Sequence, residues 1–307
     1  MTNSAGPNIF GPAEFAAGGQ QPEVVFNELE ARRSNDVRWR EGRAFSLAYY
    51  AGAEPAQVAE EAYRRFSGEN ALNTAAFPSL EQMQSEVLSI VGQWLGANEQ
   101  SAGFFTSGGT ESLLMAVKAA RDRARVERNI GKPNMVLATS AHAAFEKAAA
   151  YFDVESRRIP VRDDWRADVT AMHSAVDTNT VLIVGSAPQY PQGVIDDIPG
   201  IAAIARQHDI NCHVDACMGG VTLAYLAKLG HDIPPWNLLV DGVSSISVDL
   251  HKFGYTAKGA SVMMYASKHL RLYQVFITEN WLGGLYGSSG ILGTKSGGSI
   301  AAAWATL

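Results

Sequence analysis

Short apolar runs and amphipathic stretches alternate along most of the chain. Residues 55–66 and 80–95 repeat apolar side chains at three- and four-residue spacing, as one face of a helix does. After residue 134, further helical stretches at 145–152 and 198–207 alternate with short apolar runs. The runs predicted as strands are MVLAT, VLIVGSA, INCHVDA and SSISV. This alternation predicts an α/β fold with a mostly parallel sheet and helices on both faces.

A Gly-Gly turn leads into the most regular amphipathic stretch, FFTSGGTESLLMAVKAARDRARVE at 104–127. Its spacing predicts a helix that begins near Thr110. The first free N–H groups and the positive end of the helix dipole suit an anion. Gly108 and Gly109 permit close approach of the backbone, and the hydroxyl of Ser107 or Thr110 can donate to phosphate oxygens. We expect a phosphate-binding turn here, although helices that bind no phosphate also begin this way.

Lys252 follows a histidine at the end of SISVDLHK, which alternates small polar and apolar residues. A strand in this run would end at the carboxyl edge of the sheet, where open α/β sheets bind ligands. Lysine forms a Schiff base with pyridoxal phosphate, and we expect desolvation and neighbouring cations to keep the Lys252 amine nucleophilic. A surface lysine after a strand is the alternative interpretation.

Asp215 closes another short apolar run, INCHVDACMGG. A carboxylate against the nitrogen of a pyridine ring holds that nitrogen protonated, so that the ring accepts electrons when a bond at the substrate's Cα breaks. An aspartate that caps the following helix is the alternative. A phosphate turn, a carboxylate and a lysine in this order together predict a pyridoxal-phosphate site.

At these segments the chain resembles the group II pyridoxal-phosphate decarboxylases, and within them most closely the soluble bacterial type of sphingosine-1-phosphate lyase. The resemblance runs from about Gly42 to the last residue. It passes through TSGGTES, AHAAFEKAAAYF, SAPQYPQGVIDDI, HVDACMGG, SSISVDLHKFGYTAKGAS and WLGGLYGSSGILGTKSGG. It implies fold type I, pyridoxal 5'-phosphate as the cofactor, and a homodimer with shared active sites.

The resemblance also implies roles for individual residues in the cofactor site. Lys252 matches the Schiff-base lysine, Asp215 the partner of the pyridine nitrogen, and His142 a histidine that stacks on the cofactor ring. His251 and the Gly-Gly-Thr turn at 108–110 match groups that contact the cofactor phosphate. By itself His142 would be a histidine at a helix start or in the core, and AHAAFEKAA carries its assignment.

Four further positions concern the substrate. Tyr255 and Lys258 match a tyrosine and a lysine that bind a phosphate head group, and Tyr50 matches a tyrosine that lines the site. Asn73 stands where the lyases usually have a histidine; it donates a hydrogen bond but carries no charge. The alternatives are a core aromatic for Tyr50 and a solvated loop cation for Lys258.

Two more positions depart from the lyases. Gln192 stands where a histidine is common, and Lys295 where an arginine is usual. Lysine lacks the planar fork with which arginine grips a phosphate in two places. Whether these two residues and Asn73 alter the choice of substrate is left open by the sequence.

The resemblance divides the chain into three parts. We expect an N-terminal arm and helical segment over 1–75, with the first 35 residues loosely packed, and a large cofactor-binding domain over 76–290. The closing AAAWATL resembles the helix that leads into the family's small C-terminal domain. Residues 291–307 would then begin that domain, in a chain that is truncated at its C-terminus.

Composition fits a cytoplasmic enzyme. Of the 307 residues 47% are hydrophobic, and the formal net charge of −6 argues against a nucleic-acid partner. No apolar run long enough for a membrane span and no signal peptide is seen, so no integral membrane segment is expected. Cys212 and Cys217 lack the company of zinc ligands and are predicted to be reduced, buried thiols; no metal is expected.

The sequence thus predicts a pyridoxal-phosphate-dependent aldehyde-lyase. It would cleave a phosphorylated sphingoid base, an amino alcohol, by retro-aldol chemistry into a fatty aldehyde and phosphoethanolamine. An L-amino-acid decarboxylase and a truncated non-catalytic homologue are the alternatives. The length of the substrate chain stays open, and Lys252 and an oxygen of the cofactor phosphate are both candidates for the base.

Overall fold

The computed structural model describes residues 18–307, which fall into two compact units that meet between Leu47 and Ala48. The first unit contains helix α1 (Pro22–Arg32) and the 3-10 turns η1 (Arg33–Asn35) and η2 (Trp39–Glu41). A proline at the first position of α1 presets the backbone for a helix start. Residues 22–35 form a helix and a turn that the sequence did not predict, but all of their side chains are exposed, as in a loosely packed arm. The first part of that arm, 1–17, lies outside the described residues. The helix was missed because none of its side chains is buried, so its sequence shows no core-facing period.

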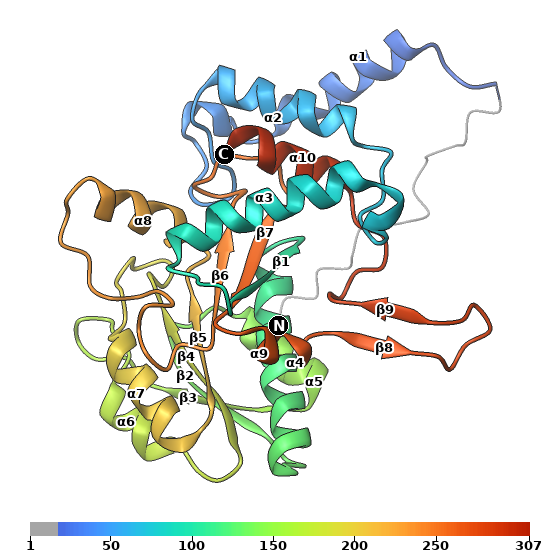
Figure 1. The fold of residues 1–307 in the computed structure, drawn as a ribbon. Helices are drawn as coiled ribbons and strands as arrows, with labels where there is room; N and C mark the ends of the chain where they lie inside the picture. The colour runs from blue at the N-terminus through green and yellow to red at the C-terminus, as the bar shows by residue number, and fades with distance from the viewer. Residues whose placement is uncertain (1–17) are drawn as a thin grey trace, which may run out of the picture. The chain divides into compact units, whose positions relative to one another are not determined.

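Among residues 48–307, seven strands form one sheet in the order β1-β7-β6-β5-β4-β2-β3 (Figure 1). They are β1 (Ala102–Thr106), β2 (Asn134–Ala138), β3 (Glu155–Ile159), β4 (Thr180–Ser186), β5 (Asn211–Asp215), β6 (Ser245–Asp249) and β7 (Ser261–Tyr265). Among these seven, β7 pairs antiparallel with β1 and β6, and the other pairings are parallel. A separate hairpin pairs β8 (Phe276–Thr278) with β9 (Tyr286–Ser288). The predicted α/β fold with a mostly parallel sheet is confirmed.

Helices cover both faces of this sheet. One face packs against α4 (Gly109–Arg128), α5 (Ala144–Phe152) and α9 (Lys268–Leu272). The other packs against α3 (Pro78–Trp94), α6 (Val169–Ala175), α7 (Ile198–His208) and α8 (Gly220–Lys228). Helix α10 (Gly297–Thr306) packs against α2 (Ala53–Arg65) and α3, and the 3-10 turn η3 (Thr74–Ala76) precedes α3 (Figure 1).

The segments around Asn70 and Lys295 pair with each other. The backbone N–H of Ala71 donates to the carbonyl of Lys295 over 2.9 Å, and that of Gly297 donates to the carbonyl of Glu69 over 2.9 Å. These bonds join regions that the sequence assigned to the first and third parts of the chain. The division at 75 and 290 stays a prediction.

Alternation along β5 and β6 puts a row of polar side chains inside the sheet. In β6, Ile246 and Val248 belong to the apolar cluster on the α3 and α8 face, so the alternate residues Ser245, Ser247 and Asp249 face α4. The register pairs Asp215 of β5 with Ser247, and it pairs Asp249 with Ser261 of β7. Every residue of β5 and β6 is buried, so this polar row lies within the fold at the carboxyl ends of the strands.

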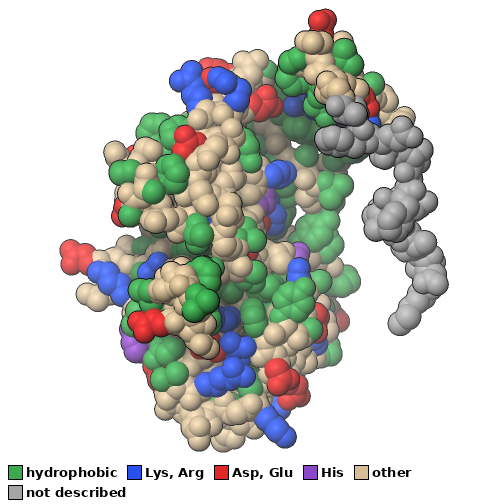
Figure 2. Space-filling view, turned by 90° about the vertical axis from the view of Figure 1, so that its right-hand side faces the viewer, with side chains coloured by type: hydrophobic (Ala, Val, Ile, Leu, Met, Phe, Trp, Pro, Cys, Tyr) green, Lys and Arg blue, Asp and Glu red, His purple; other side chains and the backbone are tan. Residues whose placement is uncertain are grey.

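On the face drawn in Figure 2, basic and acidic side chains of the described residues are interspersed with apolar ones. No helix in the part of the chain that the structure describes is long and apolar enough to cross a membrane.

Candidate active site

The turn between β1 and α4 brings backbone close to the ends of β5 and β6. A Cβ on Gly109 would lie 2.8 Å from Oδ2 of Asp249 and 2.9 Å from Sγ of Cys217, so no side chain fits there. Gly108 precedes the helix in an extended conformation. The free N–H groups at the start of α4 therefore lie beside these strand ends, and Thr110 in the first turn is exposed. This geometry suits a phosphate, and the binding of a phosphate at this turn stays a prediction.

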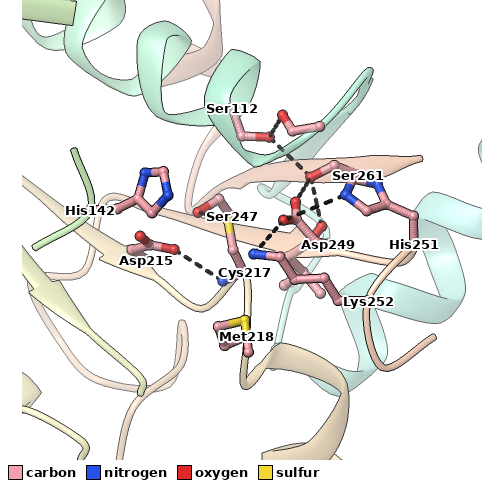
Figure 3. Close-up of polar contacts among 12 residues, drawn as sticks. Ser112, His142, Asp215, Cys217, Met218, Ser247, Asp249, His251, Lys252 and Ser261 are labelled. Carbon is pink, nitrogen blue, oxygen red and sulfur yellow. Dashed lines mark hydrogen bonds and ion pairs between the residues drawn. The ribbon is translucent and has the colours of Figure 1, made fainter. Parts of the chain in front are cut away.

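Asp215 is the last residue of β5, and its side chain is buried. Its Oδ1 accepts a hydrogen bond of 3.1 Å from the backbone N–H of Cys217, and α8 begins only at Gly220. Asp215 therefore stabilises the turn that follows β5 and is not the N-cap of α8. In the view of Figure 3 the ring of His142 is drawn over this carboxylate.

His142 lies on the loop between β2 and α5, and its side chain is exposed. Its Nδ1 accepts a hydrogen bond of 3.1 Å from the backbone N–H of Ala144. In the neutral imidazole the proton must then be on Nε2. The ring is held by its edge at the helix start, and an exposed face is left for a flat partner.

Lys252 lies three residues beyond β6, and its Nζ is 2.9 Å from Oδ2 of the buried Asp249 (Figure 3). Burial by itself lowers the pKa of Lys252, but the acidic groups of Cys217, Asp249 and Asp215 outweigh it and raise that pKa. Burial holds the pKa of the Cys217 thiol well above 9.0, so this thiol is uncharged at neutral pH. The carboxylates of Asp249 and Asp215 are therefore the groups that raise the pKa of Lys252. The expectation that neighbouring cations keep the amine nucleophilic is therefore wrong.

His251 lies between this lysine and the start of α4. A Cβ on Gly108 would be 3.5 Å from its Cε1, and its Nδ1 accepts from the backbone N–H of Ala260 over 3.3 Å. Burial lowers the pKa of His251, which favours a neutral ring whose proton is on Nε2. The Nε2–H is thus available as a donor beside the predicted phosphate turn.

Lys258 is held above the loop that carries Lys252. Its Nζ donates to the carbonyl of His251 over 3.1 Å and lies 5.1 Å from the centre of the Tyr49 ring. Burial lowers the pKa of Lys258. Tyr255 has a φ of 55°, an uncommon value for a bulky residue, and its backbone N–H donates to the carbonyl of Lys252 over 3.0 Å. Lys252, Tyr255 and Lys258 thus belong to one tight loop.

Sequence reasoning selected Tyr50 and missed its neighbour Tyr49. The hydroxyl of Tyr49 lies 3.6 Å from Sδ of Met218, and its ring meets that of Phe253 edge-on at 5.1 Å. The available signal was the pair of adjacent tyrosines itself. Tyr50 is 37% exposed, and its role in substrate binding stays a prediction.

Asn73 serves its own turn in the structure. Its Oδ1 accepts from the backbone N–H of Ala75 over 3.2 Å at the start of η3, in an exposed position. Gln192 is exposed as well, whereas Lys295 is partly buried with its Nζ 4.3 Å from the centre of the Phe104 ring. The effect of these three residues on substrate choice stays a prediction.

Asp249 is the other residue that sequence reasoning missed. It stands three positions before Lys252 in VDLHK and occupies a sheet face on which the preceding alternate residues are serines. A charged residue at a buried strand position was the available signal. Both cysteines are free and buried, as predicted.

These groups fit a flat aromatic aldehyde that carries a phosphate. The turn at Gly108 and Gly109 leaves room for an anion, Asp215 offers a carboxylate, and Lys252 offers an amine. The positions come from three strand ends and one helix start, which parallel connectivity brings to the same edge.

Residues 33–292 match the family described as the pyridoxal-dependent decarboxylase conserved domain. The chain is 42% identical to a sphingosine-1-phosphate lyase of rice (Oryza sativa subsp. japonica) over 291 residues, which are 92% of this chain and 54% of that protein. It is 31% identical to a probable L-aspartate decarboxylase of Pyrococcus furiosus, with 96% of this chain and 77% of that protein covered.

The solved structure of a sphingosine-1-phosphate lyase from Burkholderia pseudomallei K96243 superimposes with a TM-score of 0.92 at 39% identity, covering 96% of this chain and 70% of that one. The chain spans about half the length of the curated lyases that it matches, as the 54% for the rice protein illustrates. Since the family match covers most of the sequence and includes the phosphate turn, Asp215 and Lys252, the chain belongs to the pyridoxal-dependent decarboxylase family.

Proposed function

We propose that this chain belongs to a pyridoxal-phosphate-dependent carbon–carbon lyase that cleaves a phosphorylated sphingoid base into a fatty aldehyde and phosphoethanolamine. The observation that carries the proposal is the loop after β6, where Lys258 lies against the carbonyl of His251 and Tyr255 adjoins Lys252. A cation and a hydroxyl-bearing ring at the mouth of the site suit a phosphate head group. The similarity to lyases of rice and Burkholderia pseudomallei supports the same substrate class.

The residues that would hold the cofactor are those at the strand ends. The start of α4 and the Nε2–H of His251 would bind its phosphate, Lys252 would bond to it covalently, and His142 would cover its ring. When bound, pyridoxal phosphate supplies an electron sink for a bond that breaks at the substrate's Cα.

Asp215 would keep a negative charge beneath this sink. Its carboxylate is buried, and the backbone N–H of Cys217 fixes its orientation. A hydrogen bond to the charged form stabilises that form, so Asp215 is suited to hold a proton on a neighbouring ring nitrogen.

Product analysis tests the proposal. The purified chain, loaded with pyridoxal phosphate, is incubated with sphingosine-1-phosphate, with unphosphorylated sphingosine, and with a panel of L-amino acids. A fatty aldehyde and phosphoethanolamine from the first substrate alone is the expected result. Carbon dioxide and an amine from an amino acid would instead identify a decarboxylase. The similarity to the probable aspartate decarboxylase of Pyrococcus furiosus is the observation behind this second candidate.

A homodimer with shared sites and a cytoplasmic location are part of the same proposal. Large apolar side chains on and beside the β8–β9 hairpin support the dimer because their exposure is 53% at Phe276, 65% at Ile277 and 58% at Trp281. Analytical ultracentrifugation of the chain at micromolar concentration checks it, and a monomer at all concentrations would contradict it.

A further inference from the structure

Asp249 is a buried carboxylate directly beneath the predicted cofactor lysine. Its side chain is 2% exposed, and its Oδ2 lies 2.9 Å from Nζ of Lys252 and 3.9 Å from Nε2 of His251. A buried charge is costly unless it is paired and hydrogen-bonded. Burial favours the neutral form of His251, so in the described part of the chain Lys252 is the cation that pairs with Asp249.

A row of hydroxyl groups holds the other oxygen of Asp249. The Oγ of Ser261 lies 2.5 Å from Oδ1, and it is 3.3 Å from the Oγ of Ser112. Ser112 in turn lies 2.7 Å from Oγ1 of Thr106. The row comes from β7, α4 and β1, and Ser261 joins it to the carboxylate. Figure 3 labels Ser261 and Ser112 beside Asp249.

The start of α4 limits the space above Asp249. A Cβ on Gly109 would lie 2.8 Å from Oδ2 and 3.0 Å from Oδ1, so the carboxylate packs against helix backbone. Ser261 holds Oδ1, and Oδ2 is left to pair with Lys252, whose Nζ lies 2.9 Å away. The carboxylate therefore marks one position for the Nζ of Lys252.

We propose that Asp249 is a positioning residue, which holds the Nζ of Lys252 at the carboxyl end of β6 and keeps a proton on it whenever that nitrogen is not bonded to the cofactor. The proposal deepens the proposed function, on which its catalytic meaning rests. A protonated Lys252 is a proton donor, whereas an unprotonated one is a base. The two candidates for the base in carbon–carbon cleavage were Lys252 and an oxygen of the cofactor phosphate. The proposal makes the displaced Lys252 an acid instead of a base.

Other groups around Lys252 act on the same proton. Asp215 adds a second negative charge and so favours it, while the cation of Lys258 opposes it. The remaining titratable groups, Cys217 and His251, are favoured in their neutral forms by burial. Asp249 is the closest of the charged groups and the one in direct contact, so its removal has the largest predicted effect.

The first test uses the full chain freed of cofactor and needs no catalytic activity. Lysines are acetylated briefly with acetic anhydride at a series of pH values, and the modification of Lys252 is quantified by peptide mass spectrometry against exposed Lys132. In Asp249→Asn the midpoint of Lys252 modification should fall by about 1–3 pH units, the shift that an adjacent opposite charge produces. At a pH below both midpoints, Lys252 should therefore be acetylated at least about tenfold faster in Asp249→Asn than in the parent chain.

Two further variants make the result decisive. Asp249→Ser is measured in parallel, so that the outcome does not depend on the folding of one substitution, and circular dichroism checks each protein. Ser261→Ala retains the ion pair and should shift the midpoint less than Asp249→Asn does. An unchanged midpoint in both folded Asp249 variants overturns the proposal. An equal shift in Ser261→Ala also overturns it, because the cause would then be packing and not charge.

The second test uses the chain loaded with pyridoxal phosphate and follows the visible absorption of the bound cofactor against pH. A carboxylate beside the nitrogen of Lys252 favours the protonated form of the linkage, so Asp249→Asn should move the spectral midpoint to lower pH by about 1–3 units. If the parent chain binds no cofactor, the proposed function fails while the acetylation experiment still decides the role of Asp249. A spectral midpoint that Asp249→Asn leaves unchanged would count against it.

Discussion

The backbone N–H of Ile291 donates to Oε1 of Glu111 over 2.9 Å, although the two residues are 180 positions apart in the chain. The other oxygen of Glu111 accepts from the backbone N–H of Ser107 over 2.7 Å, across the turn that leads into α4. One buried carboxylate therefore fixes both the predicted phosphate turn and the loop after the β8–β9 hairpin.

Glu111→Ala should therefore weaken both segments. Two backbone N–H groups, those of Ser107 and Ile291, lose a charged acceptor. A hydrogen bond to a charged group contributes about 1.5–3 kcal/mol. The free energy of unfolding in urea should fall by about that amount or more, and pyridoxal phosphate should bind less tightly. Glu99→Ala, at an exposed position, is the matched control and should change neither quantity. A Glu111→Ala protein as stable as the parent would show that these two bonds contribute little.

Lys252→Ala should abolish covalent attachment of pyridoxal phosphate, because no other amine occupies the place beside Asp249 among the described residues. The parent chain is reduced with borohydride and digested, and mass spectrometry locates the cofactor. The assignment is wrong if the cofactor is found on Lys147, Lys258 or Lys295.

Asp215→Asn should retain the cofactor but lose turnover. The substitution preserves the shape of the side chain and removes the charge that stabilises a protonated ring. We expect a fall of at least about a hundredfold in kcat, by analogy with the loss of other preorganised electrostatic groups. Absorbance measures the bound cofactor and product analysis the turnover; near-normal turnover would argue against the role of Asp215.

Lys258→Ala should weaken the binding of phosphorylated substrates and leave the absorption spectrum of the bound cofactor unchanged. Loss of a charge-assisted hydrogen bond raises KM for the phosphorylated base by roughly ten- to hundredfold. Lys228→Ala is the matched control, since Lys228 is exposed and also lies over a tyrosine ring, 5.0 Å from that of Tyr225. If sphingosine is cleaved equally well with and without its phosphate, and Lys258→Ala changes neither rate, the site does not recognise the phosphate. That result would favour the decarboxylase.

His213 should make the fold sensitive to acid. It is fully buried between Ser245 and Ser247, and burial lowers its pKa from 6.5 to about 3. Below pH 6.5 the unfolded chain takes up a proton that the folded chain does not, so the free energy of unfolding falls as the pH drops. At about pH 4.5 the loss from this residue is about 2.7 kcal/mol.

The variant His213→Gln checks this dependence. Its free energy of unfolding should differ less between about pH 7 and 4.5 than that of the parent, by about 2.7 kcal/mol. His231→Gln, at an exposed position, should keep the parent's dependence. The same slope in all three proteins would exclude His213 as its source.

The sequence by itself determined the elements whose signal is local. Helices α3 and α4 were predicted because their apolar side chains repeat along one face, and β4 and β5 because short apolar runs end in turn residues. The same local patterns named the Gly108–Gly109 turn, Asp215 and Lys252. Their order along a parallel sheet was enough to place them at one edge, since parallel strands end on the same side.

Only the tertiary structure decided which side chains meet at that edge. Asp249 pairs with Lys252 and Ser261, and Tyr49 lies over Lys258, through contacts between segments far apart in the chain. Periodicity did not predict helix α1 or strand β1. The helix buries no side chain, and the strand contains a glycine and does not alternate buried with exposed residues. Periodicity records only which face of a segment is buried. The pKa of Lys252 depends on the charges that folding brings beside it. For that reason the expectation that neighbouring cations keep its amine nucleophilic was wrong.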